Sequence, residues 1–101
     1  MSSSVSVKVT NNQTGKSATN GIPVNGRQQT IAAVFGSSFP DNKVVASVIE
    51  VQKPAEAVGV TIITGPANGP YQTVRGDGTP LKVNNGAELD ISSWVIAAIR
   101  Q

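Results

Sequence analysis

The 101-residue chain contains no cysteine and no histidine, and only 4% of its residues are aromatic. These absences exclude a thiol redox pair, a disulfide framework and a Cys or Ser–His nucleophile, and they remove the usual ligands of zinc. The remaining chemical groups are scattered carboxylates, serines and one tyrosine, with no base placed beside a nucleophile. We therefore expect that the protein is not an enzyme and that it needs no cofactor.

Charged residues are also scarce, at 14% of the chain, with 8 basic residues against 6 acidic ones. The basic residues are spread singly and form no stripe that would contact successive phosphates, so nucleic acid is not an expected partner. No apolar run approaches the ~18 residues of a membrane span. The first residues lack the basic and then apolar pattern of a secretory signal. These features predict cytoplasmic synthesis and no membrane partner.

Valine and isoleucine are abundant, and they recur in short segments with a period of two. Val5, Val7 and Val9, for example, alternate with polar residues, as expected of a strand with one buried face. Further strands are expected at residues 29–35, 43–52, 58–64, 71–75, 80–83, 87–91 and 94–99. Segment 43–52 is apolar on both faces, which predicts a central strand. Residues 94–100 could be a helix capped by Ser92 and Ser93, but the β-branched residues of this segment favour a strand over 94–99.

Turn signals separate these segments. Asn-Gly pairs stand at 20–21, 25–26, 68–69 and 85–86, and Asp77-Gly78 belongs to the same class. Such pairs accept the positive φ angles of tight hairpin turns, and Asp77-Gly78 predicts a hairpin between 71–75 and 80–83. Seven or eight short strands at this spacing predict one all-β domain over residues 1–101, a small antiparallel β-sandwich or barrel.

Several residues are candidates for contact with a partner. Arg75-Gly76-Asp77 resembles the tripeptide that integrins recognise, although Asp77 is expected to make the turn while Arg75 points to solvent or to a neighbour. Trp94 is either the largest core residue, an interface anchor or a platform for a sugar ring, and Tyr71 is a second stacking candidate.

Two acidic residues, Glu88 and Asp90, are spaced to share one face of a strand. Paired carboxylates serve acid–base catalysis, and with Asp77 and Asn84 or Asn85 they offer oxygen ligands for Ca²⁺. No calcium-loop spacing is present, however, and the aromatic residues are too few for a sugar-cleaving cleft. We therefore interpret both residues as solvent-exposed acids and predict no metal site.

Few of the expected strands carry the lysines that monomeric proteins use to protect sheet edges, so a partner chain is expected to protect them. This favours a homo-oligomer or a larger protein assembly, with the polar residues Ser2, Ser3 and Ser4 held by a neighbour. The overall character is similar to that of small bacteriophage virion proteins, the capsid decoration (cement) and tail accessory proteins. That likeness implies a structural protein of the virion that stabilises an assembly by binding it. The alternative is a small lectin-like domain in which turn amides and Tyr71 or Trp94 bind carbohydrate.

Overall fold

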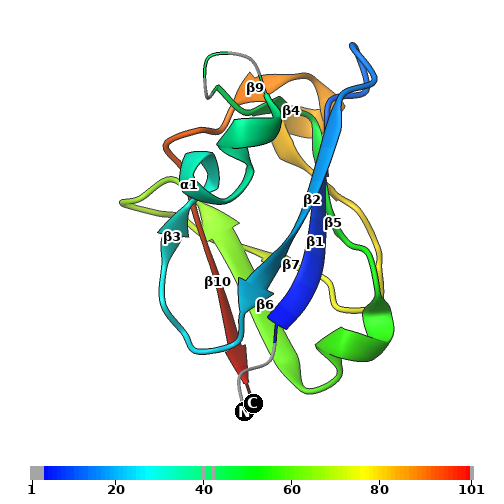
Figure 1. Cartoon of the computed structure of the whole chain (residues 1–101), viewed down its shortest axis with the longest axis vertical. Coiled ribbons are helices and arrows are strands. Elements are labelled where there is room, and N and C mark those ends of the chain that lie inside the picture. The colour runs from blue at the N-terminus through cyan, green and yellow to red at the C-terminus, as the bar shows by residue number, and fades with distance from the viewer. Residues whose placement is uncertain (1–3, 40, 42, 101) are drawn as a thin grey trace.

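The computed structural model describes residues 4–39, 41 and 43–100. Two four-stranded antiparallel sheets and one two-stranded sheet account for most of its regular structure (Figure 1). The alternation at the start of the chain has the predicted effect, because Val5, Val7 and Val9 are fully buried while the residues between them are partly exposed. The expectation of a chain dominated by antiparallel β-structure is confirmed.

The first sheet has the spatial order β2 (Ser17–Pro23), β1 (Ser4–Thr10), β5 (Val48–Val51) and β8 (Leu81–Lys82). The β1–β2 hairpin pairs Val7 with Asn20 and Thr10 with Ser17, so the connecting loop spans residues 11–16. On its other side β1 pairs with β5, which places β5 in the interior of the sheet.

The second sheet has the order β3 (Gln29–Thr30), β10 (Val95–Arg100), β6 (Val60–Gly65) and β7 (Gln72–Val74). The strand predicted for the last segment is therefore confirmed, and its helical alternative is wrong. The small third sheet pairs β4 (Val45–Ala46) with β9 (Leu89–Asp90). Valine, isoleucine and alanine side chains from all three sheets belong to one hydrophobic cluster, together with Phe35 and Phe39. Neither large sheet closes on itself into a barrel within the described residues.

The strand predicted for residues 29–35 is wrong after its second residue, because β3 leads directly into the helix α1 (Ile31–Phe35). Thr30 is the N-cap, and its Oγ1 accepts a hydrogen bond from the backbone N–H of Ala33 at 3.2 Å. The backbone N–H of Ile31 donates to the carbonyl of Trp94, and that of Ala32 to the carbonyl of Ser92. These distant carbonyls satisfy donors that the start of a helix leaves free, so tertiary contacts decide the local structure.

The hairpin predicted across Asp77-Gly78 is also wrong. Strand β7 pairs with β6, while β8 pairs with β5 in the other large sheet. The turn therefore connects two sheets and does not join two paired strands. Segment 43–52 is likewise divided, since β4 and β5 belong to different sheets and are separated by Ser47. The backbone N–H of this buried serine donates to the Thr10 carbonyl at 2.8 Å, where the chain passes from one sheet to the other.

The Asn-Gly pairs have unequal roles. Asn68-Gly69 does lie in the turn of the β6–β7 hairpin, where Gly69 takes a φ of 75°. Asn20-Gly21 instead lies inside β2, so the turn expected there is absent. The side-chain amide of Asn20 donates to the Val34 carbonyl at 2.8 Å and ties β2 to α1. Within the described part of the chain, no helix has the length and apolar character needed to cross a membrane.

Candidate functional site

The structure distributes the predicted contact residues over separate places. Ser2 and Ser3 lie outside the described residues, and Ser4 is the exposed first residue of β1. Tyr71 and Arg75 flank β7, one on each side. Trp94 immediately precedes β10 and is partly buried against the hydrophobic core. The candidates therefore form no single cluster, and two of them stand at the two ends of β7.

Tyr71 is one of the exposed large hydrophobic residues, with 41% of its surface accessible. Its hydroxyl donates to the Ala67 carbonyl at 2.7 Å, which fixes the ring relative to the β6–β7 turn. The ring also lies close to Gly65: a Cβ atom added to that glycine would be only 3.3 Å from Cδ1 of Tyr71. An aromatic side chain in this position is pre-ordered and still accessible, which lowers the entropic cost of contact with a partner.

The Arg75–Gly78 turn is held by its own side chains. Arg75 Nη2 lies 3.3 Å from Asp77 Oδ2, and the two side chains remain 67% and 55% exposed. Asp77 Oδ1 also accepts the backbone N–H of Thr79 at 2.9 Å. Gly78 has a φ of 91°, a conformation that glycine adopts without strain. The turn thus presents a compensated pair of charges in a fixed position.

The carboxyl group of Asp77 is expected to titrate at unusually low pH. Hydrogen bonds from the side chain and backbone of Thr79 lower the pKa of Asp77 from 3.8 to about 2, and Arg75 acts in the same direction. Because the folded-state pKa lies below the unfolded one, the resulting stability is present above pH 3.8 and is lost as pH falls toward 2. NMR titration of this carboxyl should show the low midpoint, and Asp77→Asn should remove the corresponding acid dependence of unfolding. A midpoint near 3.8 would contradict the Thr79 contacts.

An apolar surface missed by the sequence analysis adjoins this turn. Residues Pro54–Ala57 form a short 3-10 helix, shown in green near the lower right of Figure 1. It is followed by Val58, which is 77% exposed. Strand β6 begins only at Val60, so the strand predicted from residue 58 starts too early and Val58 is left outside the sheet. We call the patch the Val58 surface; it borders a hollow of about 400 Å³ and comprises Pro54, Ala55, Ala57, Val58, Gly76 and Asp77.

The Val58 surface is anchored to strand β1 and to the connection between β7 and β8. Glu56 Oε1 accepts the backbone N–H of Ser6 at 3.0 Å, and this bond lowers the pKa of the Glu56 carboxyl. The buried side chain of Ala57 packs against Gly76, where an added Cβ would lie only 3.2 Å from the alanine Cβ. The segment thus holds its exposed valine in a fixed position.

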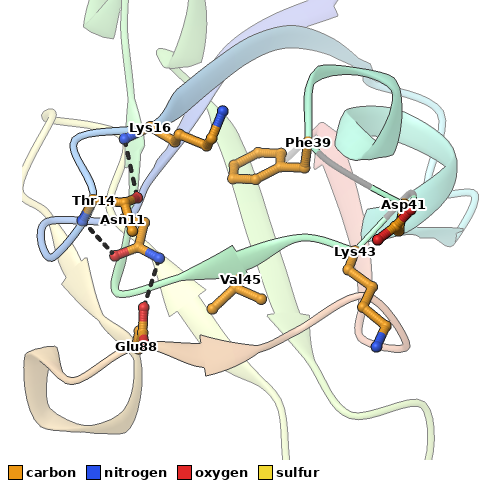
Figure 2. Close-up of a pocket in the computed structure, with 8 residues that line it drawn as sticks. All are labelled: Asn11, Thr14, Lys16, Phe39, Asp41, Lys43, Val45 and Glu88. Atoms are coloured by element: carbon orange, nitrogen blue, oxygen red, sulfur yellow. Dashed lines mark hydrogen bonds between the residues drawn. The ribbon is translucent and has the colours of Figure 1, made fainter.

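A second hollow of about 370 Å³ lies beside the β1–β2 loop (Figure 2). Its central polar residue is Asn11, which is 3% exposed. Asn11 Oδ1 accepts the backbone N–H groups of Gln13 at 2.9 Å and Thr14 at 3.3 Å, and Nδ2 donates to Glu88 Oε2 at 2.9 Å. Asn11 thereby shapes the loop and attaches it to the segment before β9. We call this the Asn11 hollow; its lining residues are Asn11, Thr14, Lys16, Phe39, Asp41, Lys43, Val45 and Glu88.

The two acids singled out by their spacing are both exposed, and each is engaged locally. Glu88 lies just before β9 and accepts the Asn11 bond, while Asp90 Oδ1 accepts the backbone N–H of Ser92 at 3.0 Å. Hydrogen bonding to Ser92 lowers the pKa of Asp90, and the nearby Lys43 acts in the same direction. The described residues contain no group of three or more acidic side chains arranged to hold a metal ion.

Comparison with known proteins finds no match to a protein-family model, a curated protein or a solved structure. The function is therefore argued from the surfaces themselves.

Proposed function

We propose that this chain is a non-catalytic structural protein that acts by binding other proteins, with its two four-stranded sheets arranged as a small open β-sandwich. Its role would be that of a virion component, a phage capsid decoration (cement) protein or a tail accessory protein. The observation that carries the proposal is Val58, an aliphatic side chain that is 77% exposed on an anchored segment. Exposed apolar surface bordered by polar groups is typical of protein contact sites.

The chemistry of the Val58 surface suits a contact between proteins. Its centre is apolar, from Pro54, Ala55 and Val58, and its rim carries Asp77, whose carboxylate is paired with Arg75. A protein interface commonly has this arrangement, with desolvated apolar groups surrounded by polar ones. A protein that binds an assembled shell more tightly than its separate subunits stabilises the shell by that difference in affinity. The proposed activity needs no reacting group.

Placing a charge at Val58 is expected to abolish binding to the partner particle. The Val58→Asp variant would bury an unpaired carboxylate in the contact and should weaken co-sedimentation with particles from the same source at least about tenfold. The matched control is Ala33→Asp, which adds the same charge at an exposed position in the first turn of α1. The proposal would be contradicted if Val58→Asp bound the particles as well as the wild type does. It would also be contradicted if the wild-type chain co-sedimented with no particle from that source.

The carbohydrate-binding alternative is favoured by one observation, the Asn11 hollow. Lys16 and Lys43 supply donors there, Asp41 and Glu88 supply acceptors, and Val45 contributes apolar surface (Figure 2). Neither Tyr71 nor Trp94 lines this hollow, so the stacking residues proposed from the sequence are elsewhere. Binding to a glycan array that is lost in a Lys16→Ala variant would favour this second function. Binding lost in Trp94→Ala instead would favour the site suggested by the sequence.

A further inference from the structure

Strand β7 forms an edge of the second sheet and pairs on one side only, with β6. Outside that ladder, no backbone hydrogen bond of the described chain reaches residues 72–74. The strand itself, Gln-Thr-Val, contains no charge and no proline, the devices with which proteins usually prevent edge-to-edge pairing. An unprotected edge of this kind is a template for another strand.

The other edges of the two large sheets are better protected. Strand β8 has only two residues, of which Lys82 is charged. Strand β2 is tied to α1 at Asn20, whose side-chain amide donates to the Val34 carbonyl. Strand β3 also has only two residues, and it continues directly into α1.

The residues of β7 and its flanks divide between two faces. Val74 is buried and pairs with Ile62, so it belongs to the inner face of the sheet. By strand alternation Tyr71, Thr73 and Arg75 share the outer face, and all three are exposed. The outer face therefore carries, in order, an aromatic ring, a small hydroxyl residue and a cation.

We propose that two copies of this chain pair through β7, antiparallel and about a two-fold axis at Thr73. In that register Thr73 faces its own counterpart, and Tyr71 of each copy faces Arg75 of the other. Directly opposed residues share a face in an antiparallel pair, so the guanidinium lies beside the partner ring as in a cation–π contact. Because the axis generates the contact twice, one aromatic and one cation per chain suffice. The second sheets of the two copies become one continuous eight-stranded sheet.

The local structure prepares both members of this contact. Tyr71 is backed by Gly65, and its hydroxyl donates to the Ala67 carbonyl and accepts a hydrogen bond from Gln28 Nε2 at 3.5 Å. With these contacts in place, 41% of its surface is still accessible. The charge of Arg75 is compensated within its own chain by Asp77, at 3.3 Å. Pairing of the two strands therefore brings no uncompensated charge to the edge. Val58 is not part of β7, so it takes no part in the paired strands. The inference rests on the proposed function, since it names a second copy as one of the partners.

Charge exchange at Thr73 tests the register. In Thr73→Lys or Thr73→Glu, two like charges face each other across the axis, so each variant should dimerise about fivefold more weakly than the wild type by sedimentation equilibrium. An equimolar mixture of the two should recover dimerisation as a heterodimer, because opposite charges then face each other. Ser17→Lys and Ser17→Glu, at an exposed residue of the β2 edge, form the matched control pair and should leave dimerisation unchanged.

The outcomes separate this inference from the proposed function. A wild-type chain that remains monomeric at millimolar concentration overturns β7 pairing, even when the same chain binds particles through the Val58 surface. A dimer that is insensitive to both Thr73 variants, or a mixture that fails to associate, also overturns it. In a double-mutant cycle, Tyr71→Ala and Arg75→Ala should together weaken the dimer by less than the product of their single effects. Independent single effects would contradict the Tyr71–Arg75 contact.

Discussion

Replacing Phe35 by alanine is expected to lower the free energy of unfolding by about 3–5 kcal/mol. Phe35 is 1% exposed and is among the largest fully buried side chains of the protein. It is the last residue of α1, and the hydrophobic cluster to which it belongs includes residues of all three sheets. Since a small domain has a total stability of about 5–15 kcal/mol, this single cavity would leave the protein close to its unfolding threshold.

Urea denaturation followed by tryptophan fluorescence measures this loss. Trp94 is the only tryptophan and packs partly buried against the core, so its emission reports the integrity of the same cluster. Phe35→Leu is the matched control, because it keeps most of the volume and should cost less than about 1.5 kcal/mol. Equal stabilities of the leucine and alanine variants would show that the helix does not pack as the structure has it.

Phe35 also illustrates why part of the fold could not be predicted from the sequence. The alternation of Val5, Val7 and Val9 is a local pattern, and it correctly predicted a strand with one buried face. The helix that ends at Phe35 has only five residues, too few to show a helical period. Its start depends on carbonyl groups of Ser92 and Trp94, about sixty residues away in the chain. β-Branched residues at 31 and 34 favoured a strand locally, and these distant contacts overrode that preference.

Strand pairing shows the same limit. Alternation and turn residues predict strands in segments 71–75 and 80–83, and each segment does contain one, β7 and β8. Periodicity does not specify the partner, however, and β7 and β8 belong to different sheets. The assumption that neighbouring strands pair was therefore the error.

The sequence predicts those parts of the candidate surfaces that depend on residues close together in the chain. Asp77 was correctly expected to make a turn, because an aspartate before a glycine readily bonds backbone groups nearby. The local pattern predicts a strand at Val58, but the 3-10 helix ends at Ala57 and β6 begins only at Val60, which leaves Val58 exposed. The sequence offered one signal, a glycine at position 59, whose φ of 74° stops the strand from extending back to Val58.

Introducing a methyl group at Gly65 is expected to destabilise the fold by about 1–3 kcal/mol and to release Tyr71 from its position. A Cβ atom there would lie 2.6 Å from the Pro70 carbonyl oxygen and 3.1 Å from Cα of Tyr71. Both obstacles are backbone atoms, so the turn between β6 and β7 must move to admit the methyl group. Thermal unfolding of Gly65→Ala measures the cost, and the NMR shifts of the Tyr71 ring report its displacement.

Gly21→Ala is the matched control, since Gly21 also lies within a strand and neither glycine has a left-handed φ. The added Cβ would meet only the side chain of Ser4, at 3.1 Å from its Oγ, and that side chain can rotate away. The control should therefore change stability by no more than about 0.5 kcal/mol. If Gly65→Ala lost no more stability than Gly21→Ala and left the Tyr71 ring in place, the turn between β6 and β7 would not lie as close to Gly65 as described. A large effect, by contrast, would explain how a single glycine positions the aromatic residue at the open edge of β7.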